Sequence, residues 1–237
     1  MPFLSGSPPY RVVPLLARRY AGWLAVAALL VALQCLPAPV RDALAYDRRA
    51  IAGGEIWRIA TAHFVHLGWA HCIVNVACLA LCACLLAGRC RPFVTIGALA
   101  AGCGLLLWIG APEVSRYVGL SGVIYGLAVM ALLPHARRER LAGLVLLALF
   151  VRVGWQLVAG TPRAEADWLG GPVIAQGHVA GLAAGAAFAW VGARRRAGAS
   201  RRAAEAAVRC AALSASPGAH GGGPSVAGLP TTPRDPG

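Results

Sequence analysis

The sequence predicts an all-α polytopic membrane protein with a bundle of six transmembrane helices, and three observations lead to this fold class. Of the 237 residues, 58% are hydrophobic and only 13% are charged, whereas a soluble domain carries about 25% charged residues. The mean hydropathy of +0.64 is too high for a single water-facing globule. Apolar stretches long enough to form spanning helices alternate with arginine-containing breaks along the chain.

The net charge of +13 does not indicate a nucleic-acid partner. All 22 basic residues are arginine, and they cluster in alternate loops between apolar stretches, as orientation signals do. The eight cysteines include no CxxC pair, and most lie within apolar segments, where cysteine acts as a small packing residue. We therefore expect no nucleic-acid partner, no disulfide framework and no cofactor.

Six apolar stretches are predicted to span the bilayer, and together they define a membrane domain over residues 20–192. The first follows a polar, basic N-terminal segment at residues 1–19. It is expected to be retained, because Leu36-Pro37-Ala38-Pro39 is a poor cleavage site for a signal peptide. A long loop at residues 37–69 separates it from the second. The six spans are predicted at residues 20–36, 71–87, 93–109, 119–133, 141–158 and 173–192.

The arginine distribution predicts that both termini are cytoplasmic. Basic clusters lie in the N-terminal segment, after the second and fourth spans, and in the tail at residues 193–237, which all share one side of the membrane. The tail is rich in alanine, glycine, proline and arginine and is predicted to be disordered, with a short surface helix at residues 201–213 as an alternative. In this orientation the second, fourth and sixth spans all begin near the outer face.

Ser121 opens the fourth span, within the stretch Gly119-Leu120-Ser121-Gly122-Val123-Ile124-Tyr125-Gly126. A serine becomes a nucleophile when a base takes its proton, and a helix N-terminus favours a developing anion. This span has about 15 residues and is roughly 22 Å long, which is less than the hydrocarbon thickness of about 30 Å. Ser121 is therefore expected in a recessed pocket that water can reach. A serine among glycines can equally be a small packing residue.

His178 is the candidate base for Ser121, because ionisable side chains within spans are rare and usually functional. Close approach of spans four and six would bring the imidazole to the serine, and small residues permit such approach. A GxxxG pair is present on each of these two spans, and the pair on the sixth span shares the helical face of His178. The pairs are Gly122 with Gly126, and Gly181 with Gly185. Tyr125, one turn after Ser121, is expected to pack against the imidazole.

His71 and Asn75 open the second span and share one helical face at i, i+4 spacing. They lie at the predicted depth of Ser121 and His178, so their side chains could stabilise an oxyanion together with the Ser121 backbone N–H. No acidic residue lies in the second, fourth or sixth span, which favours a Ser-His dyad over a triad.

Two further polar features leave alternatives open. His63, His66 and His71 invite a metal site, but no carboxylate follows at a helpful spacing, so no metal is predicted. Arg152, in the fifth span, can either extend to the membrane surface or pair with an acid, for which Glu113 and Asp167 are candidates.

Together these motifs resemble the rhomboid family of intramembrane serine proteases, over about residues 50–192. The shared features are Trp57-Arg58 in the first loop, His66, His71 with Asn75, GLSGVIYG, and His178 with its two glycines. The resemblance implies a six-helix rhomboid-like bundle with Ser121 as nucleophile, His178 as general base, and His71, Asn75 and the Ser121 amide as oxyanion hole. It implies that Tyr125 stacks on His178 and that Trp57-Arg58 are structural. The supporting positions are Gly119, Gly122, Gly126, Gly181 and Gly185.

The six-span length and the run from Tyr46 to Arg58 look most like the rhombosortase branch, although Tyr125 is the general rhomboid residue where that branch commonly has histidine. The branch implies a bacterial inner membrane and single-span substrates with a C-terminal glycine-rich motif, a span and a basic end. The predicted function is a serine endopeptidase that cleaves such substrates near the outer face. The alternatives are a catalytically silent rhomboid-like binder of membrane proteins and a small transporter, for which no inverted repeat is present.

Overall fold

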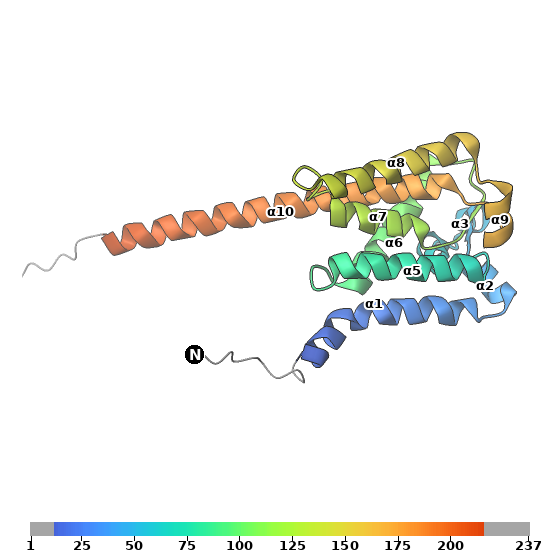
Figure 1. Ribbon diagram of the computed structural model, residues 1–237, viewed down its shortest axis with the longest axis horizontal. Helices are drawn as coiled ribbons and strands as arrows, with labels where there is room; N and C mark the ends of the chain where they lie inside the picture. The colour runs from blue at the N-terminus through green and yellow to red at the C-terminus, as the bar shows by residue number, and fades with distance from the viewer. Residues whose placement is uncertain (1–11, 216–237) are drawn as a thin grey trace, which may run out of the picture. The chain divides into compact units, whose positions relative to one another are not determined.

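The computed structural model describes residues 12–215, and most of this range is helical (Figure 1). The chain divides into two compact units, with the boundary between Ala193 and Arg194. The elements are α1 (Val12–Gln34), α2 (Ala38–Leu44), β1 (Tyr46–Asp47), α3 (Arg48–Ala52), α4 (Arg58–Thr61), η2 (Ala62–Phe64), α5 (Trp69–Leu86), α6 (Pro92–Gly110), β2 (Arg116–Tyr117), α7 (Ser121–Leu132), α8 (Arg140–Ala159), α9 (Arg163–Leu169) and α10 (Ala175–Ala215).

The helical composition confirms an all-α membrane protein. Among the described residues, α5, α6 and α8 are each long and apolar enough to cross a bilayer, and α7 is a shorter apolar helix. Helices α1 and α10 cover the positions of the first and sixth predicted spans.

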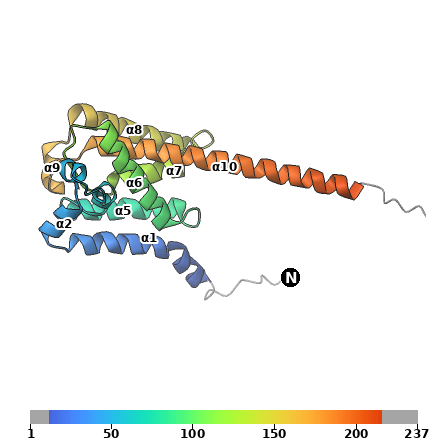
Figure 2. The same cartoon turned by 180° about the vertical axis from the view of Figure 1, so that it is seen from behind.

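Helix α7 lies at the centre of the first unit, packed against α5, α6 and α8. In both ribbon views α5 runs beside α1, and α2 and α9 lie at the same end of the helices (Figures 1 and 2). Val123 and Leu127 of α7 are fully buried, whereas Leu141 and Val158 of α8 are 74% and 87% exposed. The short helix is therefore enclosed by protein, while α8 turns apolar side chains outward, as a lipid-facing helix does.

The first loop, which the sequence predicts only as a long connection at residues 37–69, contains short helices and a strand. It contains α2, β1, α3, α4 and η2, and β1 pairs antiparallel with β2 from the loop before α7. Arg48 donates hydrogen bonds to the carbonyl oxygens of Leu107, Trp108, Ala111 and Val114, and so satisfies the orphan carbonyls at the end of α6. Strands of two residues leave no periodic signal in the sequence.

Arg58 joins parts of the first loop to one another. Its guanidinium donates to the carbonyl oxygens of Asp42 and Ala45 at 2.6 and 2.8 Å and pairs with the Glu55 carboxylate at 2.7 Å. The Trp57 indole donates to the Ala43 carbonyl at 3.4 Å. These contacts hold α2 and α4 together beside the start of β1.

Two helix boundaries differ from the sequence prediction. Helix α1 begins at Val12, so Arg18 and Arg19 lie inside it, and Arg19 donates to the Ala87 carbonyl at 2.9 Å. Helix α10 continues to Ala215 past the arginine cluster at residues 194–196, so the tail is helical over that length. It is therefore not disordered there, and the helix includes residues 201–213, which the sequence offered as an alternative. Alanine and arginine are strong helix formers, which accounts for the continuation. The remaining parts of the predicted N-terminal segment and tail lie outside the described residues.

Candidate active site

Ser121 is the first residue of α7, placed there by a tight turn at Gly119. Gly119 has a φ of +116°, which L-residues with a side chain rarely adopt. A Cβ atom at this position would lie 2.6 Å from Cε1 of His71. The Gly119 amide donates to the Ala62 carbonyl at 3.0 Å, and its carbonyl accepts from the Tyr117 hydroxyl at 2.8 Å. The turn therefore needs glycine both for its backbone and for the close approach of His71.

His178 lies on α10 within hydrogen-bond distance of Ser121, 57 residues away in the sequence. Its Nε2 atom is 2.9 Å from the Ser121 Oγ atom, and the side chain is only 4% exposed. The Tyr125 ring stacks on the imidazole, with centroids 4.5 Å apart and planes at 30°. The three residues that the sequence predicts to meet are thus in direct contact.

The contact between α7 and α10 is made by backbone atoms, and we call it the glycine contact. A Cβ atom on Gly181 would overlap the Gly122 carbonyl, and one on Gly185 would overlap the Gly126 carbonyl. The two GxxxG pairs therefore face each other with no room for a methyl group, as small-residue faces do in membranes. This closeness brings the imidazole to the serine.

Gln156 is a member of the site that the sequence analysis missed. It lies on α8, is 5% exposed, and its Oε1 atom is 2.9 Å from Nδ1 of His178. The available signal was an amide side chain within an otherwise apolar stretch of the fifth predicted span. Its partner lies on another helix, so spacing along the chain could not reveal the pair.

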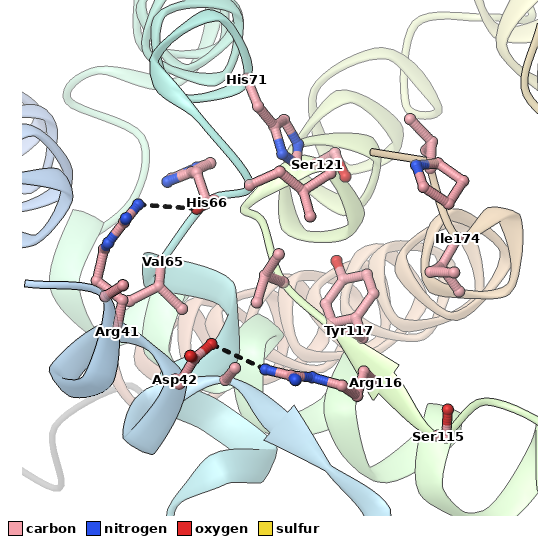
Figure 3. Close-up of a pocket in the computed structure, with 16 residues that line it drawn as sticks. Arg41, Asp42, Val65, His66, His71, Ser115, Arg116, Tyr117, Ser121 and Ile174 are labelled. Carbon is pink, nitrogen blue, oxygen red and sulfur yellow. Dashed lines mark hydrogen bonds and ion pairs between the residues drawn. The ribbon is translucent and has the colours of Figure 1, made fainter. Parts of the chain in front are cut away.

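His71 and Asn75 both reach the site from α5, and Figure 3 shows the His71 ring beside Ser121. The Asn75 side-chain amide donates to the His71 carbonyl at 2.7 Å. An amide nitrogen carries two hydrogens, so one remains for a further acceptor. His71 borders two cavities with Ser121, and Asn75 borders the smaller of them.

Two cavities meet at Ser121. The larger, of about 440 Å³, is walled by the first loop and by the segments before α7 and α10 (Figure 3). The smaller, of about 170 Å³, lies among α5, α7, α8, α9 and α10. The residues common to both are His71, Ser121 and Val173. Ser121 can therefore be approached from the loop side and from between the helices.

Burial changes the pKa of polar groups in and beside the larger cavity. Burial together with the neighbouring His71 lowers the pKa of His66, which lines the cavity, to about 3. Burial also lowers the pKa of His63, which packs against the Tyr117 ring, to about 4. Burial also raises the pKa of the Tyr117 hydroxyl. The charged residues that line the cavity are Arg41, Asp42 and Arg116, and Arg116 pairs with Asp42 at 2.8 Å (Figure 3).

Arg152 settles an alternative that the sequence left open. Its guanidinium holds both oxygens of Glu165 on α9, at 2.7 and 2.8 Å, rather than those of Glu113 or Asp167. Glu113 instead accepts a hydrogen bond from Gln176 at 3.2 Å. Arg152 and Glu165 both border the smaller cavity, so the ion pair joins α8 to α9 beside the candidate site.

This geometry is suited to acyl transfer. Nε2 of His178 can accept the Ser121 proton, and the start of α7 offers backbone N–H groups to a developing oxyanion. Within residues 12–215, no three His, Cys, Asp or Glu side chains gather in a way that could hold a metal ion.

Comparison with known proteins gives one family match. The family model of the Rhomboid domain matches residues 53–195, more than half of the 237-residue chain. The matched range includes Ser121, His178, Tyr125, Gln156, His71 and Asn75. No curated protein matches the chain significantly.

Proposed function

The chain belongs to the rhomboid family, whose members are generally intramembrane serine peptidases, and we propose that it is a serine endopeptidase with a Ser121–His178 dyad. The observation that carries this proposal is the distance of 2.9 Å between Ser121 Oγ and His178 Nε2, at the point where two cavities meet. A catalytically silent binder is not favoured, because both members of the dyad are present and in contact.

The proposed reaction proceeds in two halves. As Ser121 Oγ attacks the scissile carbonyl carbon, its proton passes to Nε2 of His178, and the imidazolium then protonates the leaving amine. The tetrahedral oxyanion is stabilised by the Ser121 N–H, the His71 ring and the free hydrogen of the Asn75 amide. Water, activated by His178, then hydrolyses the acyl-enzyme and releases Ser121. Tyr125 keeps the imidazole plane in place through both halves.

The proposed setting is a bacterial inner membrane crossed by six helices, with both termini cytoplasmic. Support comes from the arginine clusters that follow the second and fourth predicted spans. Ser121 would then lie near the outer face, where the larger cavity admits water. The proposed substrates are single-span membrane proteins, and the rhombosortase branch further implies a C-terminal glycine-rich motif followed by a span and a basic end.

Cleavage of a single-span reporter in liposomes tests the proposed chemistry. We expect Ser121→Ala and His178→Ala each to lower the cleavage rate by at least about 1,000-fold, because members of a catalytic unit fail together. Undiminished cleavage by either variant would exclude the dyad. A serine-reactive activity probe provides a second readout, because a silent binder would not be labelled at Ser121.

The substrate class is tested in the same assay with a matched pair of reporters. One carries a glycine-rich motif before its span and arginines after it, and the other has alanines in place of the glycines. Preferential cleavage of the first supports the sorting-peptidase branch, whereas equal cleavage supports a general rhomboid specificity.

A further inference from the structure

Gln156 is a buried amide on a helix that otherwise turns apolar side chains outward. Its neighbours Trp155 and Leu157 are 62% and 51% exposed, whereas Gln156 is 5% exposed. A polar group buried at membrane depth is costly unless it is hydrogen-bonded. Its Oε1 atom meets Nδ1 of His178 at 2.9 Å. The amide is therefore directed at the ring nitrogen that faces away from Ser121.

The chemistry of this contact selects one tautomer of His178. A neutral imidazole carries its proton on one nitrogen and a lone pair on the other. An amide oxygen only accepts hydrogen bonds, so a bond to Gln156 Oε1 requires the proton on Nδ1. Nε2 then has the free lone pair that must receive the proton of Ser121.

We propose that Gln156 is a positioning residue that sets the reactive tautomer of His178, a role that rests on the proposed Ser121–His178 mechanism. It occupies the place where many serine hydrolases use a carboxylate, in a chain with no acid in the second, fourth or sixth predicted span. Its carbonyl dipole also stabilises the imidazolium that forms when Ser121 is deprotonated. With Tyr125 against the ring face, the imidazole is held at both nitrogens and on one side.

Several polar or titratable side chains besides Gln156 line the smaller cavity with His178, and a substitution at position 156 leaves their identity unchanged. They come from all the helices around the smaller cavity: His71 and Cys78 on α5, Tyr125 on α7, Arg152 on α8 and Glu165 on α9. Arg152 lies four residues before position 156, on the same face of α8. It would help to keep a carboxylate at position 156 ionised.

Two substitutions separate hydrogen bonding from packing. Gln156→Met keeps a side chain of similar length but accepts no comparable hydrogen bond, and we expect it to lower kcat roughly ten-fold with KM within about two-fold. Gln156→Glu restores an acceptor, so we expect most of the lost kcat to return. A carboxylate also stabilises imidazolium, which should move the acidic limb of the kcat/KM profile to higher pH.

The matched control is Gln34→Met on α1, which replaces a glutamine that is equally buried, at 5%, and borders neither cavity. It should leave kcat and the pH profile unchanged, and thermal unfolding in detergent reports whether each variant is folded. The proposal is overturned if folded Gln156→Met retains the wild-type kcat, or if Gln156→Glu is as impaired as Gln156→Met. If the wild-type protein shows no Ser121-dependent cleavage, the proposed function fails before Gln156 is at issue.

Discussion

The two sides of the candidate site are held by different kinds of contact. Between α7 and α10 the backbones touch, and a Cβ atom on Gly181 would overlap the Gly122 carbonyl. Between α8 and α9, long polar side chains meet beside a cavity of about 170 Å³, and the Arg152–Glu165 pair is 40% and 27% exposed. Overpacking costs about 1–3 kcal/mol, whereas an exposed ion pair contributes about 0–1 kcal/mol. The contact between α7 and α10 therefore fixes the distance from Ser121 to His178. The ion pair between α8 and α9 holds α9 beside the smaller cavity.

The largest expected effect comes from adding one methyl group to the glycine contact. Gly181→Ala must push α10 away from α7, because the methyl would meet backbone atoms that cannot rotate aside. We expect this variant to lose at least about 1 kcal/mol of stability and, by separating His178 from Ser121, most of its cleavage activity. Thermal unfolding in detergent and cleavage of the reporter in liposomes measure the two effects.

Gly154→Ala on α8 is the matched control for this substitution. A Cβ atom at Gly154 would have no atom of another helix or of a side chain beyond its chain neighbours within 4 Å, so the methyl should be accommodated. Alanine also favours a helix over glycine by up to about 1 kcal/mol. Wild-type activity in Gly154→Ala together with wild-type activity in Gly181→Ala would show that the backbones at the glycine contact are not essential for the dyad.

The contact between α7 and α10 was predictable from the sequence, because polar residues and regularly spaced glycines are easy to recognise within apolar spans. Ser121 and His178 stand out against apolar spans, and the GxxxG spacing indicates which helix faces can approach. The predicted membrane orientation then puts both residues at one depth. The family match over residues 53–195 confirms the rhomboid resemblance that these motifs suggested.

The contacts that α8 makes with α9 and α10 were not predictable, because no spacing pattern in the sequence marks the residues that meet. Gln156 contacts His178, 22 positions away in the sequence, and its side chain is uncharged, so it does not stand out as an ionisable residue within a span would. Arg152 pairs with Glu165 and not with Asp167, because the position of each carboxylate depends on how α9 packs beside α8. Similarly, Arg48 satisfies carbonyl groups about 60 residues away at the end of α6, which no local rule anticipates.

Tyr125 gives an intermediate effect, because it belongs to α7 but borders the smaller cavity. Its ring stacks on His178, and such aromatic pairs contribute about 0.5–1.5 kcal/mol. We expect Tyr125→Leu to lower kcat roughly three- to ten-fold by letting the imidazole turn. Tyr125→Phe keeps the ring and should retain near wild-type kcat. If both variants behave alike in the cleavage assay, the stacking has no role in orienting His178.

The smallest expected effect lies in the Arg152–Glu165 pair, which a double-mutant cycle isolates. Arg152→Met and Glu165→Gln should each lower the unfolding temperature by about 2–4 °C, the shift that about 1 kcal/mol produces in a chain of this size. The unfolding temperature of the double variant should be little lower than that of either single variant, because each single substitution already breaks the ion pair. Neither change should alter kcat by more than about two-fold, since the glycine contact still holds His178 against Ser121. A larger loss of kcat in the single variants would mean that α9 helps to set the dyad, and that the two sides of the site are coupled.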